Sequence, residues 1–102
     1  MSQICVLTLA LPAALEEEVL DHLQAHPEWA RGFSVARAEG FGGGAGLHTA
    51  MERVRGRARR RLVTVILSQA HAESLLNSLR EQFKSPEMAY WITPLLAFGR
   101  FV

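Results

Sequence analysis

The 102-residue sequence predicts one domain of the α+β class, and three observations support this. Two short segments, residues 4–9 and 62–67, are apolar on both alternating faces, as strands buried on both sides are. Each is followed by a segment with apolar residues at helical spacing, residues 12–25 and 70–83. A weaker strand pattern follows each predicted helix, so the order is β-α-β-β-α-β. That order predicts a ferredoxin-like, four-stranded antiparallel sheet with two helices on one face.

The first helix has sequence signals at both of its ends. Pro12 stands where the first helical turn would begin, and its fixed φ suits that position. Three consecutive glutamates at 16–18 lie near the positive end of the helix dipole, where negative charge is stabilising. The apolar stripe consists of Leu15, Val19, Leu20 and Leu23. The His-Pro pair at 26–27 ends the helix, because a residue before proline disfavours the α region.

The remaining elements follow in order along the chain. Residues 32–39 form a half-polar strand pattern, which is typical of a sheet edge. After the third strand, residues 70–83 carry a second apolar stripe, formed by Ala72, Leu75, Leu76, Leu79 and Phe83. Residues 88–98 predict a last strand interrupted by Pro94. Since proline cannot donate to a ladder, this strand belongs at an edge or contains a bulge.

The two doubly apolar strands are predicted to lie at the centre of the sheet. The spatial order is then 4-1-3-2, with right-handed crossovers and both helices on one face. The second face would remain open to water, although both central strands are apolar on that side too. A closed homotrimer with the sheet faces turned inward is the simplest cover.

The composition indicates a globular protein, with 49% hydrophobic and 21% charged residues. Cys5 is the only cysteine, so no intrachain disulfide can form. We expect it to be an inert core thiol in a reducing compartment, the cytoplasm. No basic leader precedes an apolar run, and no apolar stretch approaches the roughly 20 residues that cross a bilayer. Direct membrane insertion is therefore not expected.

A basic, glycine-rich segment separates the second and third strands and is predicted to be a long flexible loop at 40–59. Its glycines let backbone N–H groups approach an anion; they are Gly40, Gly42, Gly43, Gly44 and Gly46. Guanidinium groups bind phosphate bidentately, and the candidates here are Arg53, Arg55, Arg57 and Arg59. The segment predicts an anion site or a docking arm for a partner protein, and the two hypotheses are compatible.

Three stretches carry a resemblance to a known group of proteins. They are GFGGGAGL at 40–47, ERVRGRARRR at 52–61 and AYWITPLLAFGR at 89–100. Together with the chain length and the order of elements, they resemble the PII signalling superfamily. The resemblance is closest to a PII-like family associated with heavy-metal efflux systems of the resistance-nodulation-division type, and it covers essentially the whole chain.

The resemblance implies a homotrimeric regulatory protein that binds an adenine nucleotide in the clefts between subunits. It implies that residues 40–59 read the ligand state and contact a partner, here a membrane efflux protein. It also suggests Gly99 and Arg100 as the rim of the cleft. One departure concerns residues 83–87, because the superfamily's basic glycine-rich turn that holds nucleotide phosphates has no match in FKSPE. Another nucleotide, another anion or a metal therefore stays open as the effector.

Histidines support an alternative hypothesis, a metal-binding accessory or divalent-cation-tolerance-like protein without nucleotide binding. His48 lies in the glycine-rich segment, where neighbouring subunits could each supply a ligand to a divalent metal. His22 and His26 are four residues apart on the first helix and can present two imidazoles to one metal. Two surface histidines without a nearby carboxylate or cysteine, however, usually bind no metal.

Two further functions are not expected. The sequence has no local Ser/His/Asp or Cys/His signature and no converging carboxylate pair, so we expect that the protein is not an enzyme. RNA-recognition domains of this fold class expose aromatic residues on their central strands. Residues 62–67 contain none, so nucleic acid is not an expected partner.

Overall fold

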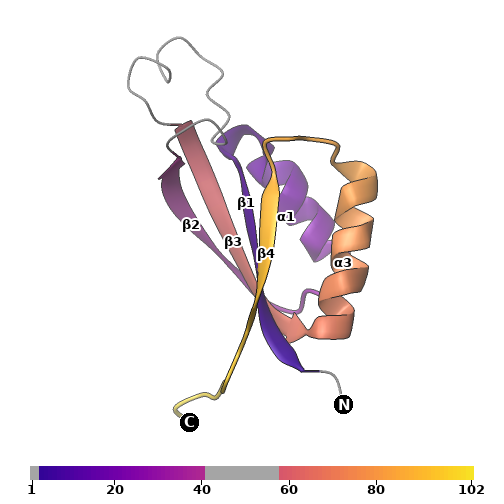
Figure 1. The fold of residues 1–102 in the computed structure, drawn as a ribbon, viewed down its shortest axis with the longest axis vertical. Helices are drawn as coiled ribbons and strands as arrows, with labels where there is room; N and C mark the ends of the chain where they lie inside the picture. The colour runs from indigo at the N-terminus through magenta and orange to yellow at the C-terminus, as the bar shows by residue number, and fades with distance from the viewer. Residues whose placement is uncertain (1–2, 41–57) are drawn as a thin grey trace.

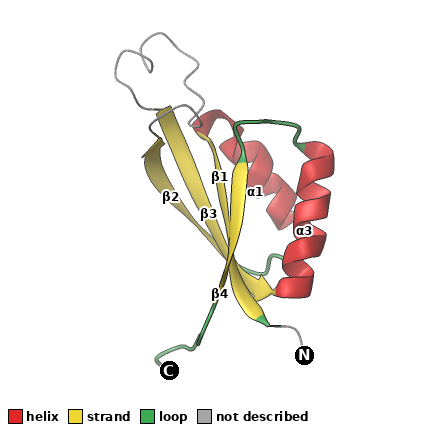
Figure 2. Cartoon of the chain, viewed as in Figure 1, coloured by secondary structure: helices red, strands yellow, loops and turns green. Residues whose placement is uncertain are grey.

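The computed structural model describes residues 3–40 and 58–102, which form one sheet with two helices on one of its faces (Figures 1 and 2). In chain order the elements are β1 (Ile4–Pro12), a 3-10 turn (Ala13–Leu15), α1 (Glu16–Gln24), β2 (Phe33–Gly40), β3 (Ala58–Ser68), α3 (Gln69–Gln82) and β4 (Ala89–Pro94). The strands lie in the order β2-β3-β1-β4, and every neighbouring pair is antiparallel. The predicted ferredoxin-like fold and the predicted strand order are both confirmed.

β1 extends further than its apolar pattern predicted, and α1 begins later. Pro12 has an extended backbone (φ −63°, ψ 145°) and lies opposite Arg60 of β3. A 3-10 turn follows, so α1 begins at Glu16 instead of Pro12. The fixed φ of proline suits a helix start and an extended segment alike, and the pairing with β3 decides between them. The three glutamates still occupy the first turn of α1, as predicted.

β3 begins at Ala58, before the predicted start at Leu62. The added residues have partners in β2, where Gly40 lies opposite Ala58 and Glu39 lies opposite Arg59. Pairing along β2 and the opposite charges of Glu39 and Arg59 favour strand structure. This cross-strand support is not visible in the local sequence, where a run of arginines gives no apolar alternation.

The predicted boundaries of the loop at 40–59 are therefore wrong at both ends, because Gly40 and Arg59 belong to strands. The rest of that predicted loop, residues 41–57, lies outside the described residues. β4 lies at the edge of the sheet, as predicted, but ends at Pro94 instead of residue 98. One further backbone hydrogen bond follows, from the N–H of Leu95 to the carbonyl of Ile4 (3.3 Å).

The helix-covered face of the sheet carries the hydrophobic core. Alternate residues of β1 and β3 are buried on this face, namely Cys5, Leu7, Leu9, Leu11, Val63, Val65 and Leu67. The helices contribute Val19, Leu23, Ala72, Leu75, Leu76 and Leu79. Burial raises the pKa of the Cys5 thiol, so its reactive thiolate form is disfavoured. The thiol therefore has the properties expected of an inert core residue.

The other side of the sheet, here called the open face, carries no helix within the described part of the chain (Figure 1). The strand register places Thr8, Thr64 and Trp91 in one row across it, and Val6 and Ile66 in the next. Ile66 is 41% exposed and Trp91 is 47% exposed. A single copy thus leaves large apolar side chains on this face in contact with water, which is the condition that predicted self-association.

Candidate functional site

Three arginines from two strands lie together at the base of the 41–57 segment. The register places Arg37 of β2 opposite Arg61 of β3, and Arg59 lies two residues before Arg61. Because alternate strand residues share a face, all three side chains belong to the helix-covered side of the sheet. We call Arg37, Arg59 and Arg61 the arginine cluster. With Ala38 and Glu39, these arginines line an open hollow of about 600 Å³.

One member of the arginine cluster is held in place by α1. The Nε of Arg61 donates to Oε1 of Glu16 (2.5 Å), and its NH1 donates to the carbonyl of Arg60 (3.2 Å). Arg37 and Arg59 are exposed to solvent. The hollow therefore combines one positioned guanidinium with two accessible ones. This arrangement suits a phosphate group, whose oxygens accept charge-assisted hydrogen bonds from guanidinium groups.

Arg60 has a different environment from its two neighbours in sequence. It is buried, and its NH2 donates to the carbonyl of Glu87 in the connection between α3 and β4 (2.7 Å). This connection is the one in which the basic glycine-rich turn of the PII superfamily is missing. Arg60 was not singled out by its sequence, because a run of three arginines does not show which one points away from the others. The alternation of side chains along a strand could have shown it, because residues 59 and 61 share one face of β3 and Arg60 lies on the other.

His22 of α1 and His26, two residues beyond its end, lie together and already have partners within the chain. His22 is buried, its Nδ1 lies 2.8 Å from Oε1 of Gln82, and its Nε2 lies 2.8 Å from Oγ of Ser78. His26 lies beside it, with ring centroids 4.8 Å apart, and also stacks on Trp29. Both ring nitrogens of His22 are therefore already hydrogen-bonded. No group of three or more potential metal ligands occurs among residues 3–40 and 58–102.

Two details of the histidine prediction are corrected. His22 is not a surface residue, because α3 covers it with two polar side chains from a distant part of the sequence. His26 does have a carboxylate nearby, since its Nδ1 lies 3.1 Å from Oε2 of Glu28. A hydrogen bond to the Glu28 backbone and, secondly, the bond to His26 hold the pKa of this carboxyl below its ordinary value.

The other predicted site residues divide into two groups. One group lies outside the described residues: Gly42, Gly43, Gly44, Gly46, His48, Arg53, Arg55 and Arg57. The other group consists of Gly99 and Arg100, which are exposed and follow β4. They leave the sheet beyond the end at which Pro94 pairs with Cys5, opposite to the end where Gly40 pairs with Ala58 (Figure 1). One copy therefore does not bring Arg100 to the arginine cluster.

The strand order, the two helices on one face and the position of the basic segment between β2 and β3 are those of the PII-like fold. The chain belongs to the family described as "Protein of unknown function (DUF3240)", whose model matches residues 1–102. A search of the curated proteins finds no significant match. Neither helix in the described ranges has both the length and the apolar character needed to span a membrane.

Solved structures with the same fold include a DUF3240 family protein from Shewanella baltica OS155, with 22% identity and a TM-score of 0.77 over 100% of both chains. CPII from Thiomonas intermedia K12, a nitrogen regulatory PII-like protein bound to ADP, AMP and bicarbonate, has 15% identity and a TM-score of 0.70. That match covers 97% of this chain and 96% of CPII. CutA from Synechococcus elongatus PCC7942 has 13% identity and a TM-score of 0.66, over 93% of this chain and 79% of CutA. The predicted resemblance to PII-like proteins is therefore confirmed at the level of the fold.

Proposed function

We propose that this protein is a PII-like regulator that binds a small phosphate-bearing effector, an adenine nucleotide, at the arginine cluster. The observation that carries the proposal is the β2–β3 register, which places Arg37 opposite Arg61 and next to Arg59 around one hollow. CPII, which shares the fold, binds ADP, AMP and bicarbonate, all of which are anions. Guanidinium groups that converge on one hollow are suited to recognising such a ligand.

The position of the arginine cluster supports a relay through the 41–57 segment. Gly40, the last residue of β2, pairs with Ala58, the first residue of β3. Arg37 and Arg59 are thus within four residues of the two ends of the segment. A ligand that binds both arginines would act directly on the strand ends from which the segment leaves. The segment would then report ligand state to a partner, as the PII resemblance implies.

The proposed assembly is a homotrimer, in which the open faces are turned inward and the effector binds at the clefts between subunits. A second copy would be needed to bring Gly99 and Arg100 to the rim of such a cleft, because they leave the sheet at the opposite end within one chain. The proposed partner, a membrane protein of a heavy-metal efflux system, is the partner class that the family resemblance implies. Removing residues 42–46 should spare assembly and interrupt the relay to this partner.

Calorimetry with ADP and with AMP tests the binding site. Each charge-assisted hydrogen bond contributes roughly 1.5–3 kcal/mol. The double variant Arg37→Ala, Arg59→Ala should therefore lower the affinity by at least about 100-fold. Arg31→Ala is the matched control, since Arg31 is also exposed but precedes β2 and does not line the hollow. The pair Arg57→Ala, Arg59→Ala extends the same test into the glycine-rich segment.

An affinity that survives the Arg37→Ala, Arg59→Ala change would show that these arginines are not phosphate ligands. The basic stretch would then be better interpreted as a docking surface for an acidic protein. A thermal-shift panel with divalent metals tests the metal-binding alternative, because a ligand of the native state raises the melting temperature. In that panel, a zinc-dependent or copper-dependent shift that His48→Ala abolishes would favour the metal hypothesis over the nucleotide one.

A further inference from the structure

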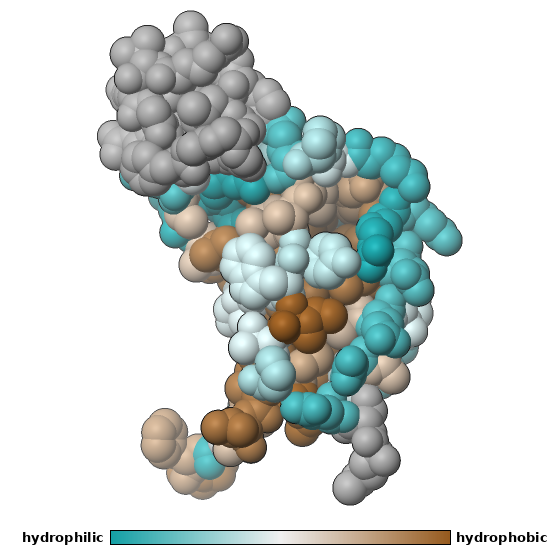
Figure 3. All heavy atoms as spheres, viewed as in Figure 1, coloured by the Kyte–Doolittle hydropathy of each residue, from teal (hydrophilic) through white to brown (hydrophobic). Residues whose placement is uncertain are grey.

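Residues 96–102, here called the tail, project from the sheet without cover. Leu96, Phe101 and Val102 are fully exposed, and Phe98 is 57% exposed. Figure 1 shows the tail continuing away from β4 below the sheet, and Figure 3 shows that it is largely apolar. Scattered single apolar residues on a surface are normal, whereas four within seven consecutive positions mark an interaction surface.

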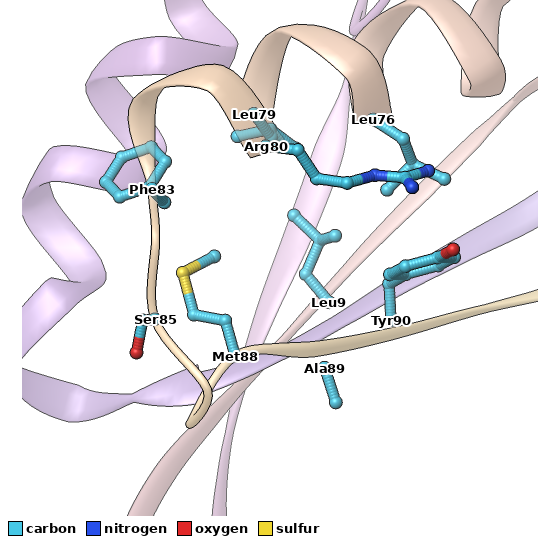
Figure 4. Close-up of a pocket in the computed structure, with 9 residues that line it drawn as sticks. All are labelled: Leu9, Leu76, Leu79, Arg80, Phe83, Ser85, Met88, Ala89 and Tyr90. Atoms are coloured by element: carbon cyan, nitrogen blue, oxygen red, sulfur yellow. The ribbon is translucent and has the colours of Figure 1, made fainter.

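An apolar cleft of about 240 Å³ lies between α3 and β4. Its apolar lining is formed mainly by Leu9, Leu76, Leu79, Phe83, Met88 and Tyr90. In Figure 4, Arg80 extends over this lining toward Tyr90, and its guanidinium carbon lies 5.0 Å from the centroid of the Tyr90 ring. An apolar cavity of roughly 150 Å³ accommodates a benzene molecule. The α3–β4 cleft is therefore large enough for one phenylalanine ring of the tail.

The tail of the same copy leaves in the wrong direction to fill this cleft. The cleft lies at the Ala89 end of β4, which pairs with Ala10 of β1. The tail begins beyond Pro94, which pairs with Cys5 at the opposite end of the same two strands. The chain would have to reverse along the whole of β4 to reach its own cleft. Instead it runs outward, with its apolar side chains accessible to another molecule (Figure 1).

We propose that the tail of one copy binds in the α3–β4 cleft of a second copy, with Phe98 or Phe101 inserted beside Met88 and Tyr90. Such a contact joins two different surfaces of the same chain, so it is head-to-tail. Each copy offers both a tail and a cleft, and successive contacts either close into a ring or continue as a filament. The contact does not depend on nucleotide binding, and it is separate from any contact through the open face.

Light scattering over a dilution series tests whether the tail helps to hold copies together. The variant Phe98→Ser, Phe101→Ser should raise the protein concentration at which the assembly dissociates by at least about tenfold, with unchanged far-UV circular dichroism. Ala97→Ser is the matched control, because it adds a hydroxyl to the tail without removing an aromatic ring, and it should keep the wild-type dissociation concentration. An unchanged dissociation concentration for the double serine variant would overturn the tail contact and leave open-face assembly standing. A monomeric wild type would overturn both.

Disulfide trapping tests which surface receives the tail. Ser85 lies at the cleft, so oxidation of the variant Ser85→Cys, Phe101→Cys should link separate chains into a ladder that ends at the size of a closed ring. The control pair Glu73→Cys, Phe101→Cys places the first cysteine at an exposed site of α3 outside the cleft and should give no ladder. Cys5 is buried and remains in both variants. A disulfide that forms within one chain, or equal linking in the control, would overturn the proposal. ADP affinity, measured separately, reports only on the arginine cluster.

Discussion

The two faces of the same four-stranded sheet differ in how much of their apolar surface one chain buries. On the helix-covered face, large aliphatic residues from β1 and β3 meet the apolar stripes of α1 and α3, and most are fully buried. On the open face, the same two strands present Thr8, Thr64, Val6 and Ile66, and only part of this surface is shielded. β1 and β3 are therefore apolar on both faces of the sheet, but the helices of one chain cover only one of these faces.

The difference separates two roles of apolar surface: packing that stabilises a single chain, and exposed surface that favours association with a second molecule. Close packing on the helix-covered face provides the dry core that a domain of this size needs. The open face and the tail carry most of the large apolar side chains that stay exposed among the described residues. The two places are distinct surfaces, so open-face assembly and the tail contact can be broken independently. The following variants sharpen this comparison, from the largest expected effect to the smallest.

The largest effect is expected from truncation of the helix-covered core. Leu7 is completely buried, so Leu7→Ala should lower the free energy of unfolding by about 2–5 kcal/mol. Ile66→Ala removes a similar number of atoms from the open face, where Ile66 is partly exposed, and should have a much smaller effect on an isolated chain. Urea denaturation at several protein concentrations measures both. Equal losses at every concentration would contradict the distinction between the two faces.

A smaller effect is expected from removing the N-cap hydrogen bond of α3. Ser68, the last residue of β3, accepts a hydrogen bond at Oγ from the backbone N–H of His71 (3.2 Å). Ser68→Ala should lower the free energy of unfolding by about 1 kcal/mol, because it leaves a helix donor without its cap. Ser74→Ala, within α3, is the control and should be neutral or slightly stabilising, since alanine has the higher helix propensity. Thermal unfolding distinguishes the two variants.

The smallest effect concerns Glu28, which follows α1 and is exposed to solvent. Its pKa is lowered in the folded state, first by a hydrogen bond to its own backbone and then by the side chain of His26. A lowered folded pKa means that the contribution to stability is present above the unfolded pKa and is lost as the pH falls through the folded pKa. NMR titration should show the Glu28 pKa rising in His26→Ala, but only part of the way, because the backbone bond remains. An unchanged Glu28 pKa in this variant would exclude the contribution of His26.

Local sequence patterns were sufficient to predict most of the architecture. Residues 4–9 and 62–67 are apolar on both faces, which correctly placed these strands at the centre of the sheet. The apolar stripes at helical spacing correctly indicated the two helices, and Pro94 correctly indicated an edge strand. These features could be predicted because hydrophobic periodicity is a property of consecutive residues and directly reflects which side of an element is buried.

Contacts between distant residues had to come from the tertiary structure. His22 is buried, and the partners of its two ring nitrogens, Gln82 and Ser78, come from α3, more than fifty residues later in the sequence. Arg60 is separated from its neighbours because strand alternation sends it to the open face and toward the carbonyl of Glu87. A local pattern does not show which distant polar group will satisfy a side chain, since that depends on strand register and helix docking.

The candidate site shows the same division between sequence and tertiary structure. The sequence by itself indicated an anion site in a basic, glycine-rich segment, and Arg59 belonged to that prediction. Arg37 was missed, because it stands alone in a half-polar strand more than twenty residues before Arg59. Only the antiparallel pairing of β2 with β3 brings Arg37 opposite Arg61, and only the docking of α1 gives Arg61 its partner Glu16. Charge along the chain is encoded locally, whereas the convergence of charges in space depends on the register that packing selects.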